Sequence, residues 1–176
     1  MRSLLSTKEQ RQLRLMEILI YKRKWLRLHE LAHTLDCTER ILKSDLNELR
    51  AAFPTIDIQS SVNGIMIDLE VNTSVEDIYQ YFLAHSQSFQ LLEYLFFNEG
   101  LPIYRTIENL HSSNANLYRL GRNITKTLST QFQIELSFTP SEIRGNEIDI
   151  RYFFAQYFSE RYYFLDWPFP DLPEED

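Results

Sequence analysis

The first third of the chain carries apolar residues at helical spacing, interrupted by short polar breaks. A capping box at Ser6–Glu9 and the apolar stripe behind it predict a first helix from about Ser6 to Tyr21. Apolar positions spaced i, i+3, i+4 and i+7 between Leu28 and Leu35 predict a second helix. After Asp36–Thr38 a longer helix is predicted to run to Phe53. A helix, a tight turn and a longer helix form a helix-turn-helix.

The pattern changes to strand-like alternation after Pro54. Ile56–Ile58 alternates, Asn63–Gly64 is a strong signal for a two-residue hairpin turn, and Ile65–Leu69 supplies the returning strand. Three helices that end in a hairpin predict a winged helix.

The same theme returns later in the chain. Residues 74–98 predict two aromatic-rich helices, and the leucine pattern of the first unit then recurs 75 residues on. The matching positions are Leu28, Leu35, Leu42 and Leu49 with Ile103, Leu110, Leu117 and Ile124. A second hairpin is expected from Phe132–Phe138 and Ile148–Ile150, around a turn at Arg144–Asn146.

The predicted fold is therefore mainly α with small β-hairpin wings, built as two winged helix-turn-helix domains joined by a helical connector. We predict the first domain at residues 1–72, the connector at 73–100, the second domain with a terminal helix at 101–166, and a linker or tail at 167–176.

Charge is unevenly distributed along this acidic chain. The net charge is −7, yet residues 1–50 hold 11 basic and 7 acidic side chains, whereas 51–100 hold 7 acidic and no basic ones. Neutralising phosphates requires clustered Lys and Arg rather than a positive total. A local basic face on the helices remains compatible with nucleic-acid binding.

The outward faces of the two longer helices of the predicted helix-turn-helix units carry the candidate DNA contacts. On the first, the polar face opposite the apolar stripe suits phosphates and base edges, and Thr38 is expected to cap the helix. On the second, Ser113 or Asn114 would cap the start and place the positive helix end near a phosphate. The candidates are Thr38, Arg40, Lys43, Ser44, Asn47, Ser113, Asn114, Asn116, Tyr118, Arg119, Arg122 and Lys126.

Three of these positions and one core position differ from the rest in charge or in their place on the helix. Arg119 and Arg122 make the second face the more basic one, whereas Asn116 lies at the edge of the core on a helical wheel. Asp45 points toward the apolar stripe, and a buried carboxylate requires a partner that the pattern does not reveal.

The string HELAH at His29–His33 raises the possibility of a zinc protease helix. Both histidines fall away from the core stripe, and a zinc site needs a third protein ligand for which His85 and His111 are poorly spaced. Two surface histidines are the better interpretation. No phosphate-binding loop or nucleophile elbow is found, and Cys37 is the only cysteine and fits as a packing residue in the turn. We expect no enzyme activity, cofactor or metal.

The chain has no apolar run near the ~20 residues of a membrane helix, and its start lacks a signal-peptide core. We expect a cytoplasmic protein.

Several longer strings resemble one family of regulators. The stretch Leu28–Leu49 resembles the helix-turn-helix of many bacterial regulators. The segments Leu92–Asn98, Arg144–Glu147, Ile150–Phe158 and Trp167–Phe169 look like the Mga family of streptococcal and enterococcal virulence regulators, over nearly the whole chain. The resemblance implies two N-terminal helix-turn-helix domains, followed in full-length members by phosphotransferase-system regulation domains and a domain similar to an enzyme IIB component.

The chain end, the histidines and Gly121 can be compared with the family pattern. The proline-rich, acidic end reads as a cut at a linker, and the phosphorylated histidines implied for full-length members are assigned to none of the four histidines here. Gly121 departs from the family, which tends to have a larger apolar residue there; glycine costs about 1 kcal/mol in a helix, so either a close contact needs the space or the helix is weak.

We expect binding to double-stranded promoter DNA and a homo-oligomer in the full-length protein. The alternative is a winged-helix module for protein interaction or dimerisation that uses the aromatic residues of Tyr152–Phe164.

Overall fold

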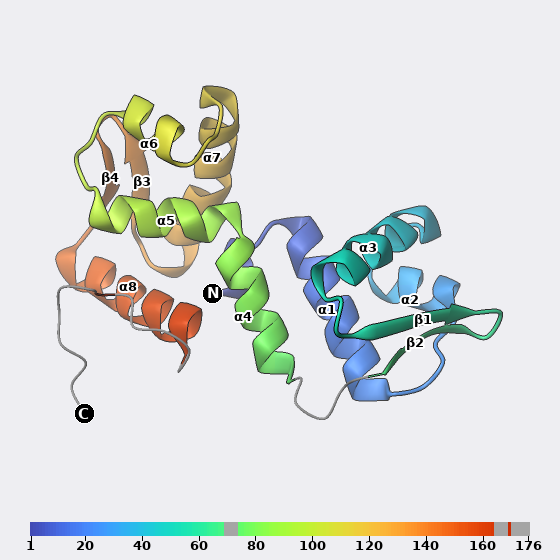
Figure 1. Ribbon diagram of the computed structural model, residues 1–176. Coiled ribbons are helices and arrows are strands. Elements are labelled where there is room, and N and C mark those ends of the chain that lie inside the picture. Colours follow the sequence, from blue (N-terminus) through green and yellow to red (C-terminus); the bar gives the residue numbers. More distant parts are fainter. Residues whose placement is uncertain (69–73, 164–168, 170–176) are drawn as a thin grey trace. The chain divides into compact units, whose positions relative to one another are not determined.

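The computed structural model describes residues 1–68, 74–163 and 169, and it divides into two compact units (Figure 1). Thr7–Phe82 is here called the N-terminal unit, and Met1–Ser6 with Leu83–Asp176 is called the C-terminal unit. Leu69 of the predicted strand and the predicted tail 167–176, apart from Phe169, lie outside the described residues. None of the helices in the described part of the chain is long and apolar enough to cross a membrane.

The N-terminal unit is the predicted winged helix (Figure 1). Its elements are α1 (Thr7–Lys22), α2 (Leu28–Thr34), α3 (Glu39–Ala52), β1 (Asp57–Ser61) and β2 (Gly64–Asp68), followed by α4 (Val75–His85), which passes into the other unit. Helix α3 packs against α1 and α2 and buries Leu42, Leu46 and Leu49. Its apolar stripe therefore forms the centre of this unit, as the helical spacing predicts.

The β1–β2 hairpin, here called the first wing, depends on Gly64. Ser61 pairs with Gly64, so the two-residue loop is Val62–Asn63, one position before the predicted turn. Leu26 exchanges backbone hydrogen bonds of 2.9 and 2.8 Å with Ile65 and extends the hairpin by one bridge. An ideal Cβ on Gly64 would lie 2.1 Å from the carbonyl oxygen of Leu26, and its φ is +123°. Only glycine fits both the approach and the backbone angle.

The C-terminal unit contains a second winged helix with additional helical elements (Figure 1). Its elements are η1 (Arg2–Leu4), α5 (Gln87–Phe97), α6 (Ile103–Asn109), α7 (Asn114–Gln131), β3 (Glu135–Phe138), β4 (Ser141–Arg144) and α8 (Glu147–Tyr162). The two helices expected in 74–98 are α4 and α5. Helix α5 packs against α7 and β4, just as α1 packs against α3 and β2 in the other unit.

The second hairpin differs from the prediction. Strand β3 pairs with β4 across Thr139–Pro140, and the predicted strand Ile148–Ile150 is wrong because these residues form the first turn of α8. The side chain of Asn146 accepts a hydrogen bond of 2.9 Å from the Ile148 amide and caps this helix. Glu147 lies in the first turn, where a negative charge is favourable. Helix capping outweighs the short alternating pattern.

The 75-residue repeat is present in the structure. Helices α2 and α6 begin and end 75 positions apart. The turn after each contains a residue of positive φ, Asp36 at 49° and His111 at 46°, again 75 positions apart. Thr38 and Ser113 then cap α3 and α7 through their hydroxyls. The two helix-turn-helix motifs therefore share one backbone design.

Aromatic side chains pack α8 against α5. The rings of Phe89 and Tyr157 stack with centroids 5.2 Å apart, and the Tyr157 hydroxyl lies 2.8 Å from the Phe89 carbonyl oxygen and 3.1 Å from a Glu93 carboxylate oxygen. Burial, and then the charge of Glu93, raises the pKa of Tyr157 well above its ordinary value. Phe153, Phe154 and Phe158 are buried as well. Much of the aromatic set of the alternative interpretation thus forms core.

Candidate nucleic-acid interface

Helix α3 presents the predicted polar face to solvent. Arg40, Lys43, Ser44 and Asn47 are exposed, opposite the buried leucines. The Thr38 hydroxyl accepts a hydrogen bond of 3.3 Å from the Ile41 amide, which ends the preceding turn and starts the helix. The positive end of α3 and its exposed cations therefore lie at one surface.

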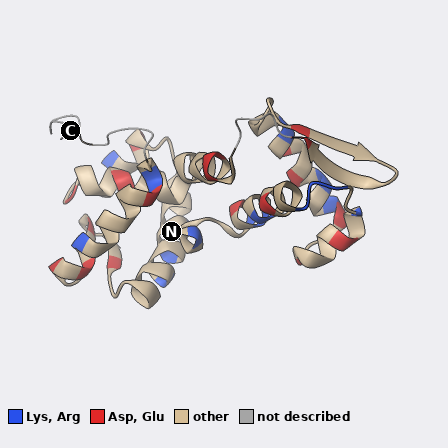
Figure 2. Ribbon diagram, turned by 90° about the horizontal axis from the view of Figure 1, so that it is seen from below, with Lys and Arg blue, Asp and Glu red and all other residues tan. Residues whose placement is uncertain are grey.

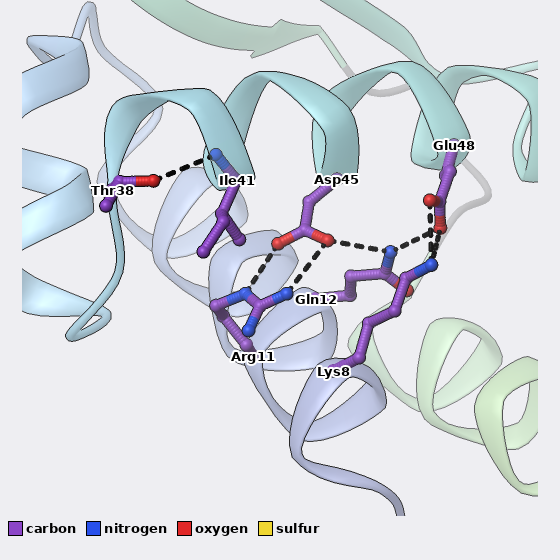
Figure 3. Close-up of polar contacts among 7 residues, drawn as sticks. All are labelled: Lys8, Arg11, Gln12, Thr38, Ile41, Asp45 and Glu48. Atoms are coloured by element: carbon purple, nitrogen blue, oxygen red, sulfur yellow. Dashed lines mark hydrogen bonds and ion pairs between the residues drawn. The ribbon is translucent and has the colours of Figure 1, made fainter.

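The partner of the buried Asp45 carboxylate, which the sequence pattern does not reveal, is Arg11 of α1 (Figure 3). Asp45 is only 1% exposed, and its oxygens accept hydrogen bonds from Arg11 Nε at 2.6 Å, Arg11 Nη2 at 3.2 Å and Gln12 Nε2 at 3.1 Å. The hydrogen bond to Asp45 raises the pKa of the Arg11 guanidinium, so this charge persists at all working pH values. A buried ion pair thus fixes α3 on α1.

A second contact continues the same row of side chains (Figure 3). Glu48 accepts hydrogen bonds from Lys8 at 2.7 Å and from Gln12 at 2.9 Å. The bond from Lys8 is the main cause that lowers the pKa of Glu48. Asp45 and Glu48, the two carboxylates of α3 that meet α1, are therefore paired with its cations, while Arg40 and Lys43 lie exposed on α3 together with Glu39 of the first turn.

Arg50 connects α3 to the first wing. Its Nε donates to the Ile58 carbonyl at 2.9 Å, its Nη2 donates to the Ser60 hydroxyl, and its Nη1 donates to the Asn47 side-chain oxygen at 3.2 Å. The sequence offers no signal for this role, because Arg50 reads as a favourable cation at the helix end.

Helix α7 presents a comparable face in the C-terminal unit. Arg119, Arg122 and Lys126 are exposed, and Asn114 is exposed at the first helical position. The Ser113 hydroxyl accepts a hydrogen bond of 3.2 Å from the Asn116 amide, so Ser113 is the cap of the two predicted alternatives.

Two of the predicted residues of α7 have local partners. The side-chain nitrogen of Asn116 donates to the Ser112 hydroxyl at 2.9 Å, and its side-chain oxygen accepts a hydrogen bond from Arg119 at 2.7 Å. Tyr118 is 45% exposed, but its ring packs edge-on against Phe138 of β3 at 5.2 Å between centroids. Asn116 therefore orients Arg119, and Tyr118 joins α7 to its hairpin.

Gly121 is required by a close contact. It is buried on α7, and an ideal Cβ there would lie 2.5 Å from the Phe138 ring and 3.2 Å from Leu136. The rings and methyl groups of β3 take the space that a larger side chain would need. Of the two explanations for this glycine, the structure supports the close contact.

Cations on the two outer faces differ from several others in the molecule. Lys8, Arg11, Arg105, Arg144 and Arg151 are paired with carboxylates. No ion-pair partner is found for Arg40, Lys43, Arg119, Arg122 and Lys126 within residues 1–68, 74–163 and 169. Figure 2 shows basic and acidic residues interspersed on the helices of both units, so this positive charge is local.

A basic loop next to the first wing was not among the candidates. Lys22 is exposed at the end of α1, and Arg23, Lys24 and Arg27 are exposed between α1 and α2. The adjoining Leu26 bonds to Ile65, which places Arg27 beside Gly64 and the turn of the wing. The sequence assigns three of these cations to a helix end and gives no sign of the hairpin contact.

The histidines of the HELAH string are exposed on α2, a helix of seven residues. Within the part of the chain that the structure describes, no group of three or more His, Cys, Asp and Glu could hold a metal ion. Cys37 is a partly buried free thiol whose pKa is raised by burial, in keeping with a packing role in the turn.

Two helix-turn-helix motifs, each followed by a hairpin and each with an exposed basic face, define a tandem winged-helix protein of the regulator class. The family model described as the M protein trans-acting positive regulator (MGA) HTH domain matches residues 6–65, and the Mga helix-turn-helix domain matches residues 71–158. The chain belongs to the Mga family.

Two relatives agree with this assignment. A protein of Streptococcus pneumoniae serotype 4, named as a trans-acting regulator, is 47% identical over 175 residues, which cover 99% of this chain and 36% of the relative. The capsule synthesis positive regulator AcpA of Bacillus anthracis is 28% identical over 171 residues, which cover 94% of this chain and 34% of the relative. The chain thus spans about a third of the length of these relatives. Both family models describe helix-turn-helix domains, and the chain contains one match to each.

Proposed function

We propose that this chain binds double-stranded promoter DNA in a sequence-specific manner through α3 and α7. One observation carries the proposal: the exposed cations on the outer faces of both helices lack carboxylate partners within the described residues, whereas several other cations are paired. Unpaired cations beside capped helix starts are what a phosphate backbone requires.

The residues divide into two proposed roles. Phosphate contacts come from Arg40, Lys43, Arg119, Arg122 and Lys126, with the positive ends of α3 and α7 contributing at Thr38, Ser113 and Asn114. Base contacts come from Ser44 and Asn47 of α3. Asn116 and Tyr118 support these contacts through Arg119 and Phe138 rather than reach bases freely.

A titration of labelled duplex DNA tests the proposal. Fluorescence anisotropy over a range of salt concentrations is measured for the wild type and for Arg119→Ala/Arg122→Ala. Loss of two phosphate contacts should weaken binding and reduce the slope of log K against log salt by about 2. The matched control is Arg151→Ala, because Arg151 is an exposed cation of the same unit that is paired with Glu147. Unchanged affinity of the double variant would remove α7 from the proposal.

The N-terminal unit receives the same test through Arg40→Ala/Lys43→Ala. Arg27→Ala extends it to the basic loop beside the first wing, where one phosphate contact should be lost. Binding that none of these variants weakens at low salt would contradict DNA recognition by these helices.

We propose the two winged helices as the DNA-binding domains, the first within residues 1–72 and the second within 101–166. Helix α5 belongs with the second domain, because it packs on α7 and β4. A regulator that acts on promoters works in the cytoplasm, where bacterial DNA lies. Homo-oligomer formation by the full-length protein remains part of the proposal.

An interaction module is the second candidate function. Ile148 and Tyr152, one turn apart on α8, are 75% and 65% exposed, and exposed apolar pairs of this kind serve in protein contacts. Velocity sedimentation at several protein concentrations, with and without duplex DNA, separates the two candidates. Self-association that is independent of DNA and abolished by Tyr152→Ser would favour the interaction module.

A further inference from the structure

Arg50 holds its guanidinium group in a fixed position at the end of α3. Two of its nitrogens donate to acceptors of β1, the Ile58 carbonyl and the Ser60 hydroxyl. Because the guanidinium is planar and rigid, two bonds to one strand determine the direction of its remaining donors. The third donor, Nη1, meets the side-chain oxygen of Asn47 at 3.2 Å.

This contact determines which end of the Asn47 amide faces outward. A guanidinium donates hydrogen bonds and accepts none, so the atom that faces Arg50 must be the oxygen. The amide nitrogen then points away from Arg50. Asn47 lies on the exposed face of α3 with Lys43 and Ser44, and no partner for its nitrogen is found among the residues described.

The orientation matters for the reading of bases. An asparagine that binds adenine with two hydrogen bonds uses its oxygen to accept from the N6 amino group and its nitrogen to donate to N7. Here Arg50 occupies one lone pair of that oxygen, and its positive charge opposes the approach of a second donor. Guanine presents two acceptors, N7 and O6, and thymine presents O4. Adenine presents one acceptor, N7, beside the N6 amino group, which would meet the amide oxygen already bound by Arg50.

We propose that Arg50 is a positioning residue that makes Asn47 a donor, so that Asn47 selects guanine or thymine over adenine in the major groove. This inference rests on the proposed DNA binding by α3. The arrangement is confined to the N-terminal unit, because Thr125 and Arg122 stand 75 positions after Arg50 and Asn47.

Selection from a randomised duplex library, with the bound fraction sequenced, tests the proposal on the whole chain. Asn47→Ala should lose preference at one base position, which identifies the position that Asn47 reads. The wild type should favour guanine or thymine over adenine there by about tenfold, the discrimination expected of one good base contact. Arg50→Met should move the preference toward adenine by about fivefold or more, because the amide oxygen is released.

Two further variants separate this role from a structural one. Ser60→Ala removes one bond between Arg50 and the wing but keeps the contact with Asn47, so the base preference should remain. Asn47→Asp keeps an acceptor for Arg50 and loses the donor, so the preference for guanine or thymine should vanish even if Arg50→Met fails to fold. Melting temperatures measured by circular dichroism identify variants that are unfolded.

The outcomes against the proposal are distinct from failure of DNA binding. Adenine at the Asn47-dependent position of the wild type overturns the proposal, as does an Asn47→Ala variant with unchanged preferences at every position. In both cases binding by α3 can stand. A wild-type chain that enriches no sequence and binds no duplex at low salt overturns the proposed function, and this inference with it.

Discussion

The guanidinium nitrogen Nε of Arg11 lies 2.6 Å from a carboxylate oxygen of Asp45, and this pair joins α1 to the inner side of α3. Asp45 is buried, and Gln12 supplies a further hydrogen bond to the same carboxylate. In α7 the position 75 residues after Asp45 is Leu120. Helices α3 and α7 are therefore held differently, α3 by a buried ion pair with directional bonds and α7 without this pair.

Removing one partner of this pair should destabilise the fold. Arg11→Met leaves the Asp45 carboxylate buried with only Gln12, and we expect the free energy of unfolding to fall by about 3 kcal/mol. Urea unfolding followed by circular dichroism measures the change. Arg11→Met/Asp45→Leu should recover most of it, because no uncompensated charge remains. Arg14→Ala, an exposed change on the same helix, should stay within about 0.5 kcal/mol of the wild type.

The contact between Lys8 and Glu48 should appear in the pH dependence of stability. Because its pKa is lowered in the folded protein, Glu48 contributes stability above its ordinary pKa of 4.5, and this contribution is lost as the pH falls through the lowered folded value. In Glu48→Gln the melting temperature should therefore fall less steeply below pH 4.5. Lys8→Met should reproduce most of this effect, since Lys8 is the main cause of the shift. Identical pH profiles for all three proteins would contradict the prediction.

Gly121→Ala should destabilise α7 even though alanine is the better helix former. Helix propensity alone predicts a gain of about 1 kcal/mol. The new methyl group would meet the Phe138 ring at 2.5 Å, and overpacking of a close contact costs about 1–3 kcal/mol. We expect a net loss of about 1 kcal/mol by chemical denaturation. Ser129→Ala, at an exposed position of α7, provides the control with little change; a stabilised Gly121→Ala protein would disprove the contact.

The two helix caps should respond alike to the same change. Thr38→Ala and Ser113→Ala each remove a hydroxyl that accepts an amide hydrogen bond at the start of α3 or α7, and each should cost about 1 kcal/mol. Thr38→Ser and Ser113→Thr keep the acceptor and should change the melting temperature little. A loss as large in these conservative variants would mean that the hydroxyl is not the stabilising group.

The predicted elements were correct where a long periodic pattern determined them. The leucines of α2 and α3 predict the helix-turn-helix, because burial of one face at helical spacing leaves little freedom. The short segment Ile148–Ile150 gave the wrong element, since three alternating residues carry less weight than the cap at Asn146 and the preceding Gly145. Short runs are decided by their neighbours.

The candidate interface was predictable to the extent that a helical wheel separates inside from outside. Arg40, Lys43, Arg119 and Arg122 are exposed for that reason. Partners were not predictable: the need for one at Asp45 followed from burial, but Arg11 lies 34 residues away and on another helix. The bonds of Arg50 to the wing likewise depend on the packing of a strand against α3.

The short helix η1 affects the order in which the parts of the molecule can fold. The Ser3 hydroxyl donates to the Gln131 side chain, and the Thr127 hydroxyl donates to the Ser3 carbonyl, so Ser3 packs with residues that are translated more than a hundred codons after it. The winged helix of residues 7–82 can fold during translation, while Leu4 waits for α7 before it can be buried. The C-terminal unit is therefore complete only when Met1–Ser6 packs against helix α7.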